Sequence, residues 1–317
     1  MEYLHIVTRA LAISWRHKYL WLLALLAGEA TAIGGGFGGS GGGRQSRGYN
    51  YGPNPATWTQ VTTWVSAHAA LLWTAGITLA LLGVVLFLLS AIANGALVKG
   101  SAEHDAERPF GLRQAWAAGL YTFGPVLRLR FFALILGATV AIVIGGLVLM
   151  TVVFAISHTP VAAILTGALA ATLLLAAIPF FIVFGVAVLL GVRAIVLDGK
   201  GASDGLRSGL DLIWRRRGRV ALFWLLVIVA GWIATTVVSL ALVMVALPLV
   251  GITAAAYLTG GWALAVVAGI ALGAAWLVVA LTFMGGIRAF TSTCWTLAYS
   301  RFDLQPQPAV SAQPQPA

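Results

Sequence analysis

The chain has 317 residues, of which 60% are hydrophobic and 9% are charged, and its net charge is +10. A soluble domain carries about 25% charged residues, so these few charges cannot cover a surface in water, and lipid must be the main solvent. In a soluble protein the basic excess would suggest nucleic acid. In a membrane protein it is explained by Lys and Arg collecting in cytoplasmic loops, so nucleic-acid binding is set aside.

Six apolar stretches are long enough, or nearly so, to cross the hydrocarbon core, which takes about 20 residues. The first is short and contains Glu29. A turn at Ser157–Pro160 separates the third from the fourth, because Pro and its neighbour resist helix continuation. Pro and Gly residues bracket a turn between the fifth and sixth. The stretches cover 19 to about 33, 69–98, 131–157, 161–192, 220–249 and 262–286. The predicted fold class is an all-α polytopic membrane bundle.

The N-terminus has two interpretations. Arg16, His17 and Lys18 precede the first apolar stretch, and Ala30-Thr31-Ala32 follows it. This order resembles a signal peptide with its cleavage site. The residues before the stretch are themselves patterned and match later segments, so an uncleaved first helix is favoured.

Orientation follows from the basic residues. Of the 19 Lys and Arg residues, only Arg44 and Arg47 fall on one side of the predicted spans. Such asymmetry places the other side, with both termini, in the cytoplasm of a bacterial inner membrane. We expect one membrane domain over 1–303, a flexible Gly-rich outer loop over 34–60, and a disordered Gln/Pro tail over 304–317.

An internal repeat emerges when the predicted spans are paired. Leu112-Arg113 matches Leu206-Arg207 at an offset that also relates Lys99 to Arg193, and Arg193-Ala194 matches Arg288-Ala289 at nearly the same offset. Each unit is predicted to be a cytoplasmic amphipathic helix followed by a span out and a span back. Three such units, over about 1–100, 101–200 and 201–303, would be parallel repeats around an axis along the membrane normal.

The amphipathic segments have apolar residues at helical spacing. One stripe is Leu4, Val7, Leu11 and Trp15. Two more are Leu112, Ala115, Trp116, Gly119, Leu120 and Phe123, and then Leu206, Leu210, Ile213 and Trp214. An apolar stripe beside a basic face suits a helix in the headgroup layer. Such helices either anchor the chain or offer a surface to anionic lipid or a protein partner, with Arg215, Arg216 and Arg217 as the lipid-contacting candidates.

Three motifs carry a resemblance. The segments Trp15 to Leu22, Arg193 to Gly199 and Thr293 to Tyr299 resemble uncharacterised bacterial six-helix membrane proteins. Those proteins are similar to the membrane domain attached to some glycerophosphodiester phosphodiesterases. The resemblance covers nearly the whole chain except the Gly-rich loop and the tail. It implies six helices and a cell-membrane location; it supplies no active site, and the hydrolase reaction is not implied.

Candidate chemistry in the sequence is sparse. Gly36 to Gly41 matches a dinucleotide fingerprint but lies in a low-complexity outer loop, without the strand and helix that the motif needs. Glu103 to Glu107 contains possible metal ligands, although a short charged run is usually a solvated face. No metal, cofactor or catalytic residue is therefore predicted.

Other residues are candidates because of their place in the membrane. Glu29 is the acidic residue inside a predicted span, where ionisable groups are functional by default; the alternative is an interfacial position. Lys99, Arg193 and Arg288 end the second span of each unit and either set topology or form a basic ring around an anion path. Asn94 could join helices by hydrogen bonds.

The leading functional hypothesis is a non-enzymatic membrane protein that scaffolds or assists a membrane-bound process through its cytoplasmic amphipathic helices. The alternative is a transporter or channel for a small anion or lipid-like molecule. An intramembrane enzyme ranks third, because no nucleophile has a recognisable motif. A central polar cavity would favour the transporter, and a tightly packed Ala, Leu and Val interior would favour the scaffold.

Overall fold

The structure, a computed structural model, describes residues 2–28, 55–157 and 159–303. Glu29, most of the predicted Gly-rich loop and the predicted Gln/Pro tail lie outside these residues. Every regular element within them is an α-helix. In chain order the helices are α1 (Glu2–Arg16), α2 (Tyr19–Ala27), α3 (Pro55–Ala67), α4 (Ala69–Asp105), α5 (Leu112–Tyr121), α6 (Phe123–Ile156), α7 (Pro160–Asp198), α8 (Ala202–Arg215) and α9 (Arg217–Asp303).

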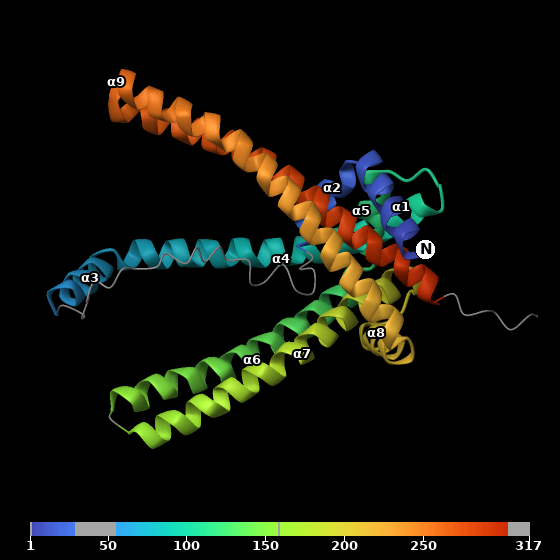
Figure 1. Ribbon diagram of the computed structural model, residues 1–317, viewed down its shortest axis with the longest axis horizontal. Coiled ribbons are helices and arrows are strands. Elements are labelled where there is room, and N and C mark those ends of the chain that lie inside the picture. The colour runs from blue at the N-terminus through green and yellow to red at the C-terminus, as the bar shows by residue number, and fades with distance from the viewer. Residues whose placement is uncertain (1, 29–54, 158, 304–317) are drawn as a thin grey trace, which may run out of the picture.

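The helices form a hub from which three arms extend to the same side (Figure 1). The hub consists of α1, α2, α5 and α8, together with the ends of the long helices that pack against them. One arm is α4, with α3 at its tip. The second is the antiparallel pair α6/α7, in which the hydroxyl groups of Thr151 and Thr166 lie 3.1 Å apart.

The third arm is α9, which reverses direction at Gly261. This glycine has φ 71° and ψ −166°, a backbone conformation that residues with a Cβ atom rarely adopt. The two halves then run antiparallel, since the indole of Trp276 donates to the Leu242 carbonyl at 3.2 Å. Nearer the hub, the rings of Phe223 and Trp295 meet edge to face at 5.3 Å. The two stretches predicted at 220–249 and 262–286 are therefore the two halves of α9.

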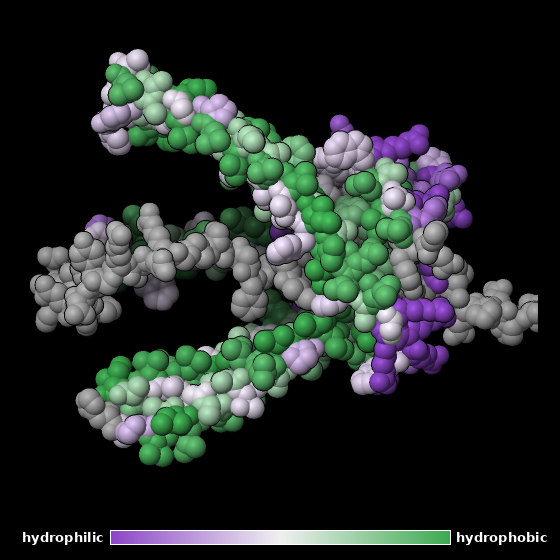
Figure 2. Space-filling model, in the orientation of Figure 1, coloured by the Kyte–Doolittle hydropathy of each residue, from purple (hydrophilic) through white to green (hydrophobic). Residues whose placement is uncertain are grey.

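Each long helix changes its surroundings along its length. In α4 the apolar residues of the outer part are exposed, whereas nearly all residues from Ala91 to Ser101 are buried in the hub. In α7 the buried stretch begins at Val186 and ends at Val196. The outer parts form the apolar arms, and the polar residues gather on the far edge of the hub (Figure 2). Arms with apolar side chains on their exposed faces need lipid as their solvent.

Four of the described helices, α4, α6, α7 and α9, are long and apolar enough to cross a membrane. At about 1.5 Å per residue, helices of this length exceed the roughly 30 Å of a hydrocarbon core, and their inner ends continue into the hub. The first predicted span begins with α2, which has nine residues and ends before Gly28 in the left-handed conformation.

Two short helices cross the long ones at very close range. At Gly119 in α5, an added Cβ would lie 2.3 Å from the carbonyl oxygen of Ile92 in α4. At Gly209 in α8, an added Cβ would lie 2.4 Å from the carbonyl oxygen of Ala187 in α7. Glycine at both crossings lets the backbones touch, as at tightly packed helix interfaces in membranes.

Candidate membrane-surface site on the hub

The hub has a small-residue and aliphatic interior. Its main cluster draws on α1, α2, α4, α5, α7 and α9, and it is rich in Ala and Leu. A second, smaller cluster joins α4, α6 and α7. Most charged groups of the described hub lie around its outside, whereas Arg193 and aromatic residues such as Phe223 and Trp295 are buried in it.

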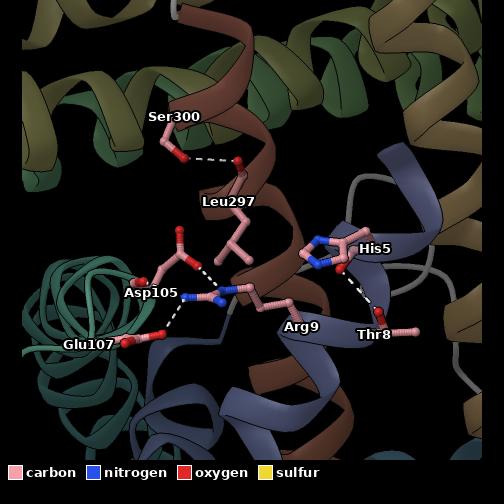
Figure 3. Close-up of polar contacts among 7 residues, drawn as sticks. All are labelled: His5, Thr8, Arg9, Asp105, Glu107, Leu297 and Ser300. Carbon is pink, nitrogen blue, oxygen red and sulfur yellow. Dashed lines mark hydrogen bonds and ion pairs between the residues drawn. The ribbon is translucent and has the colours of Figure 1, made fainter. Parts of the chain in front are cut away.

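Arg9 ties α1 to the end of α4. Its Nε atom lies 2.5 Å from a carboxylate oxygen of Asp105, and its Nη2 atom donates to the Asp105 backbone carbonyl at 2.7 Å. The same guanidinium lies 3.4 Å from Glu107. Figure 3 shows this side chain reaching from α1 towards both acidic residues. Because ion pairs that are partly exposed to solvent add little to stability, the main effect of these contacts is to orient α1 on the hub.

A second contact joins the turn between α1 and α2 to α4. The imidazole of His17 stacks on that of His104 with centroids 3.6 Å apart, and the Tyr19 hydroxyl lies 2.6 Å from Nε2 of His104. Burial, with a smaller contribution from Arg16, lowers the pKa of His17 below its usual value. The two stacked rings form a flat packing contact between this turn and α4.

The acidic run near the end of α4 is occupied by neighbouring cations. Glu103 pairs with Lys99 at 3.1 Å and with Arg108 at 3.3 Å, and Asp105 is held by Arg9. Among the described residues no group of three or more His, Cys, Asp and Glu side chains is placed to hold a metal ion.

The three basic residues predicted to be equivalent have different surroundings. Lys99 is half-buried and paired with Glu103 one turn along α4. Arg193 is fully buried (0% exposed). Its guanidinium donates to the Leu189 carbonyl at 2.6 Å and, across to α9, to the carbonyl and hydroxyl oxygens of Ser292 at 3.2 and 3.1 Å. Arg288 is half-buried, one helical turn before Ser292.

Asn94 and Glu29 are the two other residues that the sequence marks as candidates within the membrane. Asn94 is buried in the hub at 2% exposure, in the region where α5 crosses α4. Glu29 lies outside the described residues, so its position in the membrane stays a prediction.

The predicted basic segment lies at the turn between α8 and α9. We call Trp214–Arg219 the basic turn. Arg215 pairs with Asp211 at 2.9 Å. Arg217 donates to the Trp214 carbonyl at 3.2 Å, and its guanidinium lies 4.2 Å from the centre of the Trp214 ring. Trp214 itself is 59% exposed, so the turn presents an aromatic ring and several cations together.

The amphipathic helices have two apolar faces. In α1 the face that packs into the hub is Ile6, Ala10 and Ile13, whereas the predicted stripe residues Leu4, Leu11 and Trp15 are 64%, 52% and 62% exposed. Leu112 and Leu120 of α5 are exposed in the same way. The stripes seen in the sequence are therefore divided between the two faces. Val7 of α1 and Ala115 of α5 pack into the hub, as do Leu206 and Ile213 of α8, whereas the exposed members of the α1 and α5 stripes are available to lipid or a partner.

Two polar contacts were not among the sequence candidates. Arg130 of α6 donates to the Ala27 carbonyl at the end of α2 at 2.8 Å and to the Ser90 hydroxyl at 2.5 Å. Tyr299 of α9 donates to Asp198 at 2.7 Å. Arg130 lies one residue before the predicted third span. An arginine so close to an apolar run is the feature of the sequence that could have marked it as a candidate.

The chain matches no protein-family model, no curated protein and no solved structure.

Proposed function

We propose that the protein is a non-enzymatic membrane protein with six spans, in a bacterial inner membrane, that assists a membrane-bound process through its cytoplasmic hub. In this proposal the short α2 is the start of the first span and the two halves of α9 are the fifth and sixth. The three arms are three parallel units, and both termini lie with the hub in the cytoplasm.

One observation carries the proposal. The hub is held together by one face of its short helices, while a second, apolar face of α1 and α5 is exposed beside basic residues. A helix with two apolar faces buries one in its own protein, and the other is available to lipid or to a second protein. The hub therefore has the form of a docking platform at the membrane surface.

The packing favours a scaffold over an anion transporter. The main cluster of the hub consists mostly of Ala, Leu and Val side chains, with aromatic residues such as Trp295 among them, and Arg193 donates to the carbonyl groups of Leu189 and Ser292. A groove of about 720 Å³ between the outer halves of α9 is lined by apolar residues such as Ala254, Leu258 and Leu272, which do not suit an anion. The resemblance to six-helix membrane domains agrees with an accessory role and names no reaction.

The test is purification of the full chain in a mild detergent, with mass spectrometry of the proteins that remain bound. Three variants change exposed residues only: Leu4→Gln with Leu11→Gln in α1, Leu112→Gln with Leu120→Gln in α5, and Trp214→Gln in α8. We expect at least one variant to release a partner that the wild type retains, while size-exclusion elution is unchanged. An identical set of partners in the wild type and all three variants would contradict the proposal.

A further inference from the structure

The α8–α9 junction shows where the membrane surface lies on the hub. Along α9, Val220, Phe223 and Val227 face the hub and are buried. On the opposite side the exposed apolar residues begin at Leu222 and continue with Leu225 and Val229. A helix rises about 1.5 Å per residue, so the cations at 217 and 219 lie within roughly one to two turns of the first lipid-facing side chain. In the proposed orientation, that depth lies near the phosphate layer of the inner leaflet.

The cations of the basic turn differ in their availability. Arg215 is engaged by Asp211. Arg217 and Arg219 are exposed, and no described carboxylate forms an ion pair with either of them or with Arg216. The guanidinium of Arg217 uses its Nε atom for the Trp214 carbonyl, and its terminal donors have no hydrogen-bond partner among the described residues. Arginine presents these donors in a fork that matches a phosphate group.

Trp214 completes the arrangement. Its ring is exposed on α8 and stacked with Arg217, and tryptophan is enriched at the headgroup level of membranes. The opposite side of α8 is fixed by the close crossing of Gly205 and Gly209 on α7. The ring is thus held against Arg217, and Arg219 follows two residues later in the first turn of α9.

From this arrangement we infer that the basic turn binds the phosphate of an anionic phospholipid of the inner leaflet, with Arg217 and Arg219 as its contacts and Trp214 packed beside the glycerol region. The inference deepens the proposed function, because it names the lipid surface on which the hub rests. Arg215 is not a contact, since its charge is already matched by Asp211.

The experiment counts lipid bound to the full chain in detergent by native mass spectrometry, with phosphatidylglycerol or phosphatidylcholine added. The variant Arg217→Gln with Arg219→Gln should lose affinity for phosphatidylglycerol by roughly fivefold per arginine, the equivalent of about 1 kcal/mol for each basic residue near a membrane surface. Its affinity for phosphatidylcholine should be unchanged.

Two controls keep the result specific. Asp211→Asn with Arg215→Gln preserves the net charge and should bind phosphatidylglycerol as the wild type does. Arg108→Gln with Arg113→Gln removes two positive charges elsewhere on the hub and should also have little effect. An equal loss in this last variant would overturn the inference, because binding would then follow net charge alone. Displacement of phosphatidylglycerol by an equal concentration of inorganic phosphate would overturn the assignment to membrane lipid.

The lipid experiment is independent of the partner experiment. It needs neither a partner protein nor a known orientation in the membrane. The lipid result can therefore be interpreted even when no partner protein is found. Far-ultraviolet circular dichroism of each variant verifies that the helices are intact.

Discussion

The guanidinium of Arg193 lies between α7 and α9, where its Nη1 atom donates to Leu189 and its Nη2 atom donates to Ser292. A fully buried cation is costly unless its donors find acceptors, and here the Leu189 carbonyl and the carbonyl and hydroxyl oxygens of Ser292 accept from its two terminal nitrogens. Two roles are thus open to the residue: a cation of an anion path, as its spacing from Lys99 and Arg288 predicts, or a clamp between two helices. The geometry of its hydrogen bonds supports the clamp.

Replacing Arg193 by Lys separates these two roles, because the charge is kept and the planar fork is lost. We expect Arg193→Lys to reduce stability by about 1–3 kcal/mol, the cost of leaving buried hydrogen bonds unmade. The reduction would be measured as a lower midpoint of thermal unfolding in detergent. Arg288→Lys, at a half-buried site, should change stability by less than about 0.5 kcal/mol. An unchanged midpoint for Arg193→Lys would rule out the clamp.

At the scale of the helices, the crossing of α5 on α4 depends on backbone contact. Gly119→Ala would place a methyl group 2.3 Å from the Ile92 carbonyl oxygen and 3.1 Å from Ala96. Neither is the end of a flexible side chain, so the helices must move apart. We expect a loss of about 1–3 kcal/mol, as for an overpacked core, seen as faster proteolysis of the α5 region and a lower unfolding midpoint.

Gly137→Ala is the matched control, since nothing lies within 4 Å of an added Cβ at this site in α6. It should be neutral, or slightly stabilising through helix propensity. Equal effects of the two substitutions would mean that α5 is not held against α4 by this contact.

At the scale of the whole molecule, the arms and the hub predict a topology. The reversal between α6 and α7 and the reversal within α9 lie at the arm tips, and the turns after α4 and α7 lie at the hub (Figure 1). Reporter fusions after Arg47, His158 and Tyr257 should report the outside, and fusions after Glu107, Arg207 and Arg301 the inside. An inside signal at Arg47 would exclude an uncleaved first helix as drawn. Loss of residues before Ile33 from the mature protein would support cleavage.

The helical, membrane-spanning character of the chain follows from sequence alone. Long apolar runs with few charges can satisfy their backbone groups in lipid only as helices or closed barrels, and their length favours helices. The α6/α7 reversal and the division of α9 were likewise predictable, because Pro160 and Gly261 interrupt the runs at those places. The α1 and α8 segments are recognisable by their helical spacing.

The surroundings of individual side chains were decided by the tertiary structure. Periodicity shows that Leu4 and Leu11 share a face, but α1 has a second apolar face, and only packing against α9 and α4 selects Ile6 and Ala10 for the interior. Equal spacing made Lys99 and Arg193 equivalent in the sequence. In space one is paired with Glu103 on its own helix, and the other is enclosed between two helices. The physical reason is that spacing along a helix determines the side of the helix on which a side chain lies. Its burial and hydrogen bonding depend on which distant segment of the chain packs against that side.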